Sequence, residues 1–197
     1  MKFLVVARPI DNAGDWLITD RLVSLVRNIA KELDPTSRVE FGNALKRNPV
    51  DYYNSFDSIV IGGGPIADNS LLGSDSFDVM AKLNQITTPV SLIGVGWYGA
   101  TTTSKDVFAY IVAPDLKDKL RAITQSGGVI GVRDVITQYV LSNNGIDSVV
   151  TGCPVWYPKD LGVSGLSKNI NLNPKKIVFS NAGITKNPSV HEAVVRQ

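Results

Sequence analysis

The chain has 197 residues, of which 44% are apolar and 19% charged, a composition that allows one full hydrophobic core and a short additional segment. Its 20 basic residues nearly cancel its 18 acidic ones, which argues against a nucleic-acid partner. With one cysteine and one histidine the chain can form neither an internal disulfide nor a Cys/His zinc site, so we expect no metal and a reducing, cytoplasmic location.

Strands and helices alternate along most of the chain. In chain order, we predict a strand at 3–7, a helix at 17–29, strands at 38–41 and 58–61, a helix at 77–83, a strand at 90–95, a helix at 107–123 with a break near Pro114, a strand at 128–132, a helix at 133–141, and strands at 147–151 and 176–180. No apolar stretch approaches the length of a membrane span, which leaves peripheral contact as the way to meet a membrane.

The predicted strands are apolar throughout, which is typical of a parallel sheet covered by helices on both faces. We therefore expect a doubly wound, Rossmann-like α/β fold, in which ligands bind beyond the carboxyl ends of the strands. Residues 1–162 should form this lobe, 163–174 a polar linker, and 175–197 the start of a second lobe.

Asn12-Ala13-Gly14-Asp15 lies where the first strand gives way to the first helix. The free N–H groups and the helix dipole at such a position attract phosphate or carboxylate groups. Asp15 has three interpretations: it caps the helix, orients a ligand, or acts as a general base.

Two glycine-rich segments follow the third and fourth strands. Gly62-Gly63-Gly64 permits close backbone approach to a ligand, and Asp68 beyond it either accepts a hydrogen bond from a sugar hydroxyl or caps a turn. In the second segment, Gly94-Val95-Gly96-Trp97-Tyr98-Gly99, the aromatic residues either stack on a sugar or base or belong to the core.

Arg133-Asp134 follows the predicted strand at 128–132. An arginine at this edge can bind a carboxylate or phosphate through two parallel hydrogen bonds, and the alternative is a local ion pair or a helix cap formed by Asp134. Cys153, in Thr151-Gly152-Cys153-Pro154, has no nearby histidine and is interpreted as a small packing residue. His191 is interpreted as incidental.

In their order and spacing, these motifs resemble the polysaccharide pyruvyl transferase family, over most of the chain from Met1 to about Ser180. The resemblance implies one lobe of a GT-B-like fold that transfers pyruvyl from phosphoenolpyruvate to a sugar of a cell-surface glycan precursor, forming a ketal, with no cofactor beyond the donor substrate. The partners would be phosphoenolpyruvate and a sugar or lipid-linked glycan acceptor, and a homo-oligomer is compatible with this scheme.

The resemblance also implies roles for particular residues. Arg133 would hold the carboxylate or phosphate of phosphoenolpyruvate, and Asp15 or Asp68 would orient the acceptor hydroxyl. The catalytic candidates are thus Asp15 and Arg133, and the substrate-binding candidates are Asn12, Gly14, Gly62, Gly63, Gly64, Asp68, Gly94, Gly96 and Asp134.

Two other functions remain open at the level of the sequence. A glycosyltransferase that uses a nucleotide sugar has the same architecture. A non-catalytic binding module is the second, because the family's second lobe carries arginine and histidine residues and this chain stops at Gln197, soon after that lobe would begin. We accordingly expect a fragment, a site completed by another subunit, or a fold without transferase activity. A dinucleotide-dependent oxidoreductase is disfavoured, since the first turn lacks the three glycines of that fingerprint.

Overall fold

The computed structural model describes residues 1–7, 13–64, 77–97 and 109–158. Within them six parallel strands form one sheet in the order β2-β1-β3-β4-β5-β6. The strands are β1 Lys2–Ala7, β2 Arg38–Asn43, β3 Ser58–Gly64, β4 Val90–Val95, β5 Ile130–Val132 and β6 Val149–Val150. The predicted parallel α/β architecture is confirmed.

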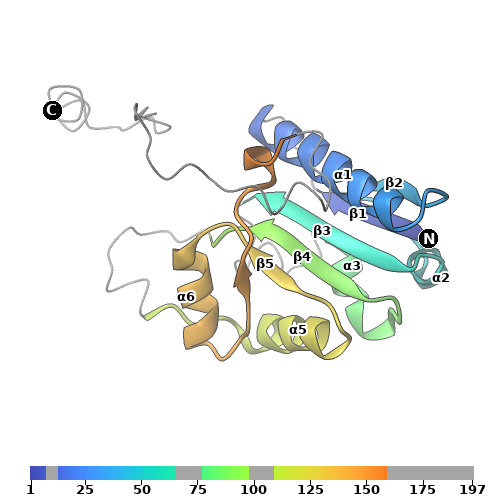
Figure 1. Ribbon diagram of the computed structural model, residues 1–197. Helices are drawn as coiled ribbons and strands as arrows, with labels where there is room; N and C mark the ends of the chain where they lie inside the picture. Colours follow the sequence, from blue (N-terminus) through green and yellow to red (C-terminus); the bar gives the residue numbers. More distant parts are fainter. Residues whose placement is uncertain (8–12, 65–76, 98–108, 159–197) are drawn as a thin grey trace, which may run out of the picture. The chain divides into compact units, whose positions relative to one another are not determined.

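Helices cover both faces of this sheet. The helical elements are α1 Ala13–Leu33, α2 Val50–Asn54, α3 Asp78–Ala81, the 3₁₀ turn η1 Leu83–Gln85, α5 Pro114–Gln125, α6 Val135–Asn143 and the 3₁₀ turn η2 Pro154–Trp156. Figure 1 shows α1 along one face, with α3 and α5 on the other. The described part of the chain is therefore doubly wound. None of its helices combines the length and apolar character needed to cross a bilayer.

The core follows from the alternation of side chains along the strands. Leu4 and Val6 of β1 belong to the large apolar cluster that also contains Phe77 and Leu120, whereas Val5, which lies between them, is fully buried outside that cluster. Successive residues of a strand point to opposite faces, so both faces of β1 are covered. Burying each such Leu or Phe stabilises the fold by about 1.5–3 kcal/mol.

The order of the strands sets where a ligand can bind. From β1 the chain passes to β2 on one side, and it then returns to β3 on the other side. The carboxyl ends of β1 and β3 therefore lie at the switch point of the sheet, next to those of β4 and β5. This edge is where doubly wound proteins bind their ligands.

Several predicted boundaries differ by a few residues from those of the structure. The strand expected at 58–61 continues through Gly64, because its glycines pair within the sheet as β3. The break predicted near Pro114 in the helical segment 107–123 is confirmed, because residues 110–113 are not helical and α5 begins at Pro114. Proline disfavours helical conformation in the residue before it, and the side chain of Asn144 binds the backbone of Tyr110 and Val112. The predicted linker and second lobe lie outside the described residues.

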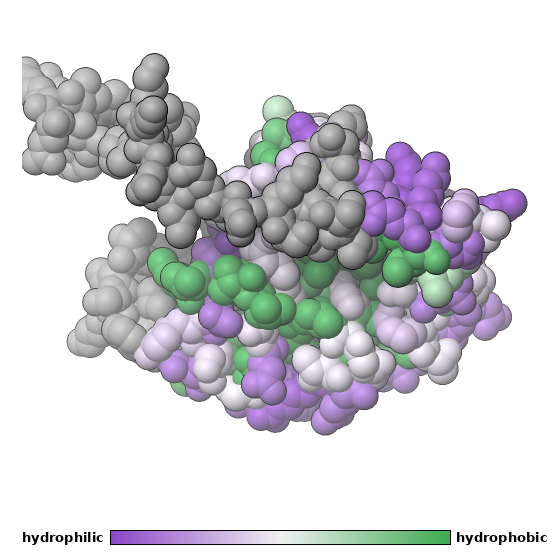
Figure 2. All heavy atoms as spheres, in the orientation of Figure 1, coloured by the Kyte–Doolittle hydropathy of each residue, from purple (hydrophilic) through white to green (hydrophobic). Residues whose placement is uncertain are grey.

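The surface around β6 differs from the surface around α1. Figure 2 shows apolar side chains gathered over α6 and β6, where Val135, Ile136, Val149 and Val150 are exposed. Charged side chains predominate on the opposite side of this view, over α1 and β2. The end of the sheet nearest the Arg133 motif is thus the more apolar one.

Candidate functional site

Backbone hydrogen bonds hold four of the sequence motifs side by side at the carboxyl edge of the sheet. The N–H of Gly96 donates to the carbonyl of Gly64 at 2.9 Å, and the N–H of Arg133 donates to the carbonyl of Val95 at 2.9 Å. The N–H of Gly152 donates to the carbonyl of Val132 at 3.2 Å. The structure therefore brings the glycine-rich strand ends, Arg133 and the Gly152 segment together, although they are far apart in the sequence.

Asp15 lies in the first turn of α1 at the same edge. With Ala7, Ile18, Thr19, Gly62 and Gly63 it surrounds a hollow of about 10 Å³. That volume suits about one water molecule. The carboxylate of Asp15 is partly exposed, and Gly14 lies in the same turn. The structure thus joins Asp15 to the first glycine motif, in a space too small for a whole substrate.

The glycines of β3 have a packing role. A Cβ on Gly62 would lie 1.7 Å from Cδ2 of Leu22, and a Cβ on Gly63 would lie 2.0 Å from Cγ2 of Ile18. Gly63 and Gly64 also have positive φ values of 68° and 86°. Helix α1 can approach β3 this closely only because these positions lack side chains. Direct contact between these glycines and a substrate stays a prediction.

The glycines of the second motif make room for two other segments. A Cβ on Gly94, whose φ is 67°, would lie 2.4 Å from Cδ of Pro154. A Cβ on Gly96 would lie 2.1 Å from Nε and 2.5 Å from Cζ of Arg133. The guanidinium group of Arg133 therefore lies directly over the backbone of Gly96, at the end of β4. The side chain of Arg133 is 35% exposed, so a ligand can reach it.

Asp134 positions this arginine and also caps α6. One carboxylate oxygen accepts hydrogen bonds from the N–H of Thr137 at 2.7 Å and from the hydroxyl of Thr137 at 2.8 Å. The other carboxylate oxygen pairs with Nε of Arg133 at 3.2 Å. The ion pair and the helix cap considered for Asp134 are therefore both present.

The same network reaches the end of β4. The hydroxyl oxygen of buried Thr137 accepts a hydrogen bond from the N–H of Trp97 at 2.8 Å, while its proton goes to Asp134. Trp97 packs edge-on against Tyr110, with ring centroids 5.2 Å apart. Among the described residues, Asp134 is the polar partner of the Arg133 side chain, and it engages Nε. Within the part of the chain that the structure describes, no ion pair engages the Nη groups of Arg133.

A comparison with known protein families identifies the chain. The family model described as polysaccharide pyruvyl transferase matches residues 12–195, nearly the whole chain. The chain belongs to the polysaccharide pyruvyl transferase family. No curated protein and no solved structure matches it. The family inferred from the motifs is thereby confirmed, and the matched range includes every residue proposed for the site.

Some residues discussed in the sequence analysis lie outside the described residues. These are Asn12, Asp68, Tyr98, Gly99 and His191. Their roles stay predictions. Cys153 is a free, partly buried thiol next to η2. Within the part of the chain that the structure describes, no group of three or more His, Cys, Asp or Glu side chains is placed to hold a metal ion.

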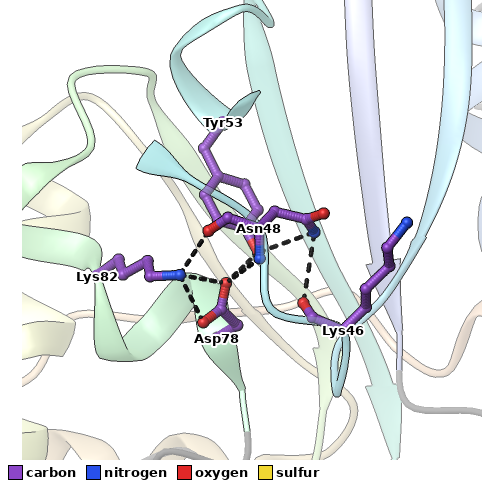
Figure 3. Close-up of polar contacts among 5 residues, drawn as sticks. All are labelled: Lys46, Asn48, Tyr53, Asp78 and Lys82. Atoms are coloured by element: carbon purple, nitrogen blue, oxygen red, sulfur yellow. Dashed lines mark hydrogen bonds and ion pairs between the residues drawn. The ribbon is translucent and has the colours of Figure 1, made fainter. Parts of the chain in front are cut away.

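The sequence did not reveal a buried polar cluster around Asp78, which Figure 3 shows. Asp78 is only 5% exposed, and its carboxylate accepts hydrogen bonds from the hydroxyl of Tyr53 at 2.8 Å and the N–H of Asn48 at 3.0 Å. Nζ of Lys82 lies 2.8 Å from the other carboxylate oxygen. The i, i+4 spacing of Asp78 and Lys82 was the local signal, but Asn48 and Tyr53 are distant in sequence.

The Asp78 cluster holds a buried carboxylate in its charged form and links α3 to the sheet. Burial opposes ionisation of Asp78, but the hydrogen bonds from Lys82, Asn48 and Tyr53 outweigh it and lower the pKa of this carboxyl group. Burial is also the main cause of the raised pKa of Tyr53. The N–H of Asp78 donates to the carbonyl of Ala44, whose own N–H donates to the carbonyl of Ala7 at the end of β1. The start of α3 is thus fixed to the carboxyl edge of the sheet at the end of β1.

Proposed function

We propose that this chain binds phosphoenolpyruvate at Arg133 and transfers its pyruvyl group to a sugar of a cell-surface glycan precursor, as a ketal. The observation that carries the proposal is the position of the Arg133 guanidinium group over Gly96. Its Nε pairs with Asp134, and its Nη groups have no ion-pair partner among the described residues. Arginine binds planar carboxylates and phosphates with two parallel hydrogen bonds. The family match supports pyruvyl transfer rather than transfer of a sugar from a nucleotide, which the fold alone allows equally.

The proposed reaction uses two hydroxyl groups of one sugar. Both oxygens become bonded to C2 of phosphoenolpyruvate, and the bond from C2 to the phosphate oxygen breaks. One hydroxyl proton goes to C3, which becomes a methyl group, and the other leaves with the phosphate. The products are the pyruvyl ketal and inorganic phosphate, so atoms and charge balance.

Arg133 and Asp15 have separate tasks in this scheme. Arg133 pairs with the carboxylate or phosphate of the donor and orients C2. Asp15, at the switch point between β1 and β3, accepts a proton from the attacking sugar hydroxyl. Asp134 acts through Arg133, because its carboxylate is occupied by Thr137 and by Nε.

Thermal unfolding of the chain with phosphoenolpyruvate, pyruvate, UDP and a UDP-sugar tests the proposal. A ligand at 100 times its dissociation constant adds about 2.7 kcal/mol, which is a rise in Tm of about 5 to 10 °C for a chain of this size. We expect this rise with phosphoenolpyruvate, its loss in Arg133→Ala, and its retention in Arg121→Ala, which removes an arginine of α5.

Other outcomes contradict the proposal. A rise with UDP or the UDP-sugar but not with phosphoenolpyruvate would identify a glycosyltransferase. No rise with any of the ligands would favour a non-catalytic binding module. An equal response in wild type and Arg133→Ala would remove Arg133 from the donor site.

A further inference from the structure

The segment after β6 crosses the carboxyl edge of the sheet. The N–H groups of Thr151 and Gly152 both donate to the carbonyl of Val132, at 2.8 and 3.2 Å, and Val132 directly precedes Arg133. Pro154 then packs over Gly94. Figure 1 shows the following turn, η2, beside α1, and the two elements are in contact. The segment thus begins next to Arg133 and ends at the helix that carries Asp15.

Trp156 is the last residue of η2, and its ring rests on the backbone of this segment. A Cβ on Gly152 would lie 3.1 Å from Cε3 and 3.4 Å from Cζ3 of Trp156, so the six-membered ring lies against Gly152. The hydroxyl of Tyr157 donates to the carbonyl of Thr151 and closes the segment into a loop. The indole therefore packs against a loop that this hydrogen bond constrains.

Despite this support, Trp156 is 75% exposed. Isolated exposed apolar residues are common on proteins and need no explanation. Trp156 differs in two respects: its ring is backed by a glycine with a positive φ of 77°, and its loop is hydrogen-bonded to the residue preceding Arg133. A large aromatic surface is thus presented at the ligand-binding edge, next to the candidate donor site.

We propose that Trp156 is a stacking platform for the sugar ring of the acceptor, an inference that rests on the proposed function. A pyranose ring has one face made largely of C–H groups, and these carry the partial positive charge that the negative face of an indole attracts. Reacting atoms must approach within about 3–3.5 Å, so the acceptor has to lie beside the donor at Arg133. Arg133 would then bind the anionic donor and Trp156 the uncharged acceptor.

NMR of the full chain labelled with 5-fluorotryptophan tests this inference. The chain has three tryptophans, and single Trp→Phe variants assign their signals. The probes are methyl glycosides of glucose, galactose, mannose and N-acetylmannosamine, titrated with and without phosphoenolpyruvate. We expect at least one glycoside to shift the Trp156 signal in a saturable way, and Trp156→Ala to weaken that binding about tenfold, measured by calorimetry.

Matched variants separate stacking from a general effect of exposed aromatic residues. Trp156→Phe keeps a ring and should keep most of the affinity. Phe41→Ala removes an exposed ring from β2, at the far end of the sheet, and should leave affinity unchanged. Circular dichroism should show that all three variants are folded, since Trp156 and Phe41 contribute little to the core.

The outcomes distinguish this inference from the proposed function. If phosphoenolpyruvate stabilises the protein but no glycoside shifts the Trp156 signal, or Trp156→Ala binds glycosides as well as wild type, the platform is wrong and the proposed function stands. If a glycoside shifts the signal but phosphoenolpyruvate has no effect, the sugar platform stands and the proposed function fails. A Trp156 signal that changes with protein concentration alone would show that a second copy covers this surface, and would overturn the inference.

Discussion

The contact between Gly96 and Arg133 allows a substitution that should weaken the proposed binding of phosphoenolpyruvate while leaving the fold intact. In Gly96→Ala the new Cβ would lie 2.1 Å from Nε, 2.5 Å from Cζ and 2.8 Å from Cδ of Arg133, so the guanidinium group must leave its place. It can do so, because the side chain of Arg133 is partly exposed and flexible. Gly96 also lacks a positive φ, so alanine causes no backbone strain there.

The expected changes in stability and in affinity follow from the contacts that Arg133 loses in Gly96→Ala. Displacing Arg133 breaks its partly exposed pair with Asp134, which is worth about 0–1 kcal/mol, and replacing glycine by alanine restores a similar amount through the unfolded chain. The free energy of unfolding should therefore change by less than about 1 kcal/mol. Losing hydrogen bonds from a guanidinium group to an anion costs about 1.5–3 kcal/mol, so the Kd for phosphoenolpyruvate should rise about 10- to 100-fold.

Calorimetric titration gives the Kd, and urea denaturation gives the free energy of unfolding. Gly42→Ala is the matched control, because Gly42 lies in β2, away from Arg133. Its new Cβ would lie 3.2 Å from Cδ1 of Leu4 in β1. In an Arg133→Ala background, Gly96→Ala should have no further effect on binding. An unchanged Kd in Gly96→Ala, or an effect that persists without Arg133, would refute the assignment of Arg133 to the donor site.

Three further predictions concern the support of the site. In Gly62→Ala the new Cβ would meet fully buried Leu22 at 1.7 Å, so the free energy of unfolding should fall by about 1–3 kcal/mol in urea denaturation; an unchanged value would contradict the packing role of Gly62. Asp78→Asn removes the carboxylate partner of Lys82 and should cost about 1–3 kcal/mol in the same assay, whereas Asp51→Asn, at an exposed position, should cost less than about 0.5 kcal/mol. The folded protein lowers the pKa of Asp78 below 3.8, so its contribution is present above that pH and is lost as the pH falls below it. The stability difference between wild type and Asp78→Asn should therefore shrink as the pH falls through 3.8 and below, and a constant difference would show that the charge of Asp78 is irrelevant.

The fold was predictable because its signals are local. The strands β1, β3 and β4 are buried or partly buried along their length and begin as short, mostly apolar runs bounded by glycine or polar turns, which is typical of a parallel sheet. Pro114 marked a break in the helical pattern at 107–123, and α5 begins at that residue. The sequence did not show that Asn144, which is distant along the chain, binds the backbone of Tyr110 and Val112 just before this helix.

The candidate site was predictable in part. Adjacent residues showed that Arg133 and Asp134 could pair, and the order of the strands placed the glycine motifs at one edge. The sequence did not show that Arg133 lies over Gly96, because that contact depends on the register between β4 and β5. The Asp78 cluster was not predicted either, because it also depends on long-range contacts. Asn48 and Tyr53 approach Asp78 only in the folded chain.

The contacts at the edge divide the glycines by what occupies the space above them. Side chains of α1 fill the space over Gly62 and Gly63, and Pro154 fills the space over Gly94. Over Gly96 lies a charged, partly exposed group that can itself bind a ligand. The first role of the glycine motifs is therefore to let α1, η2 and Arg133 pack closely against the sheet. Such close packing brings Asp15, Arg133 and Trp156 to one edge of the sheet, where we propose that the donor and the acceptor meet.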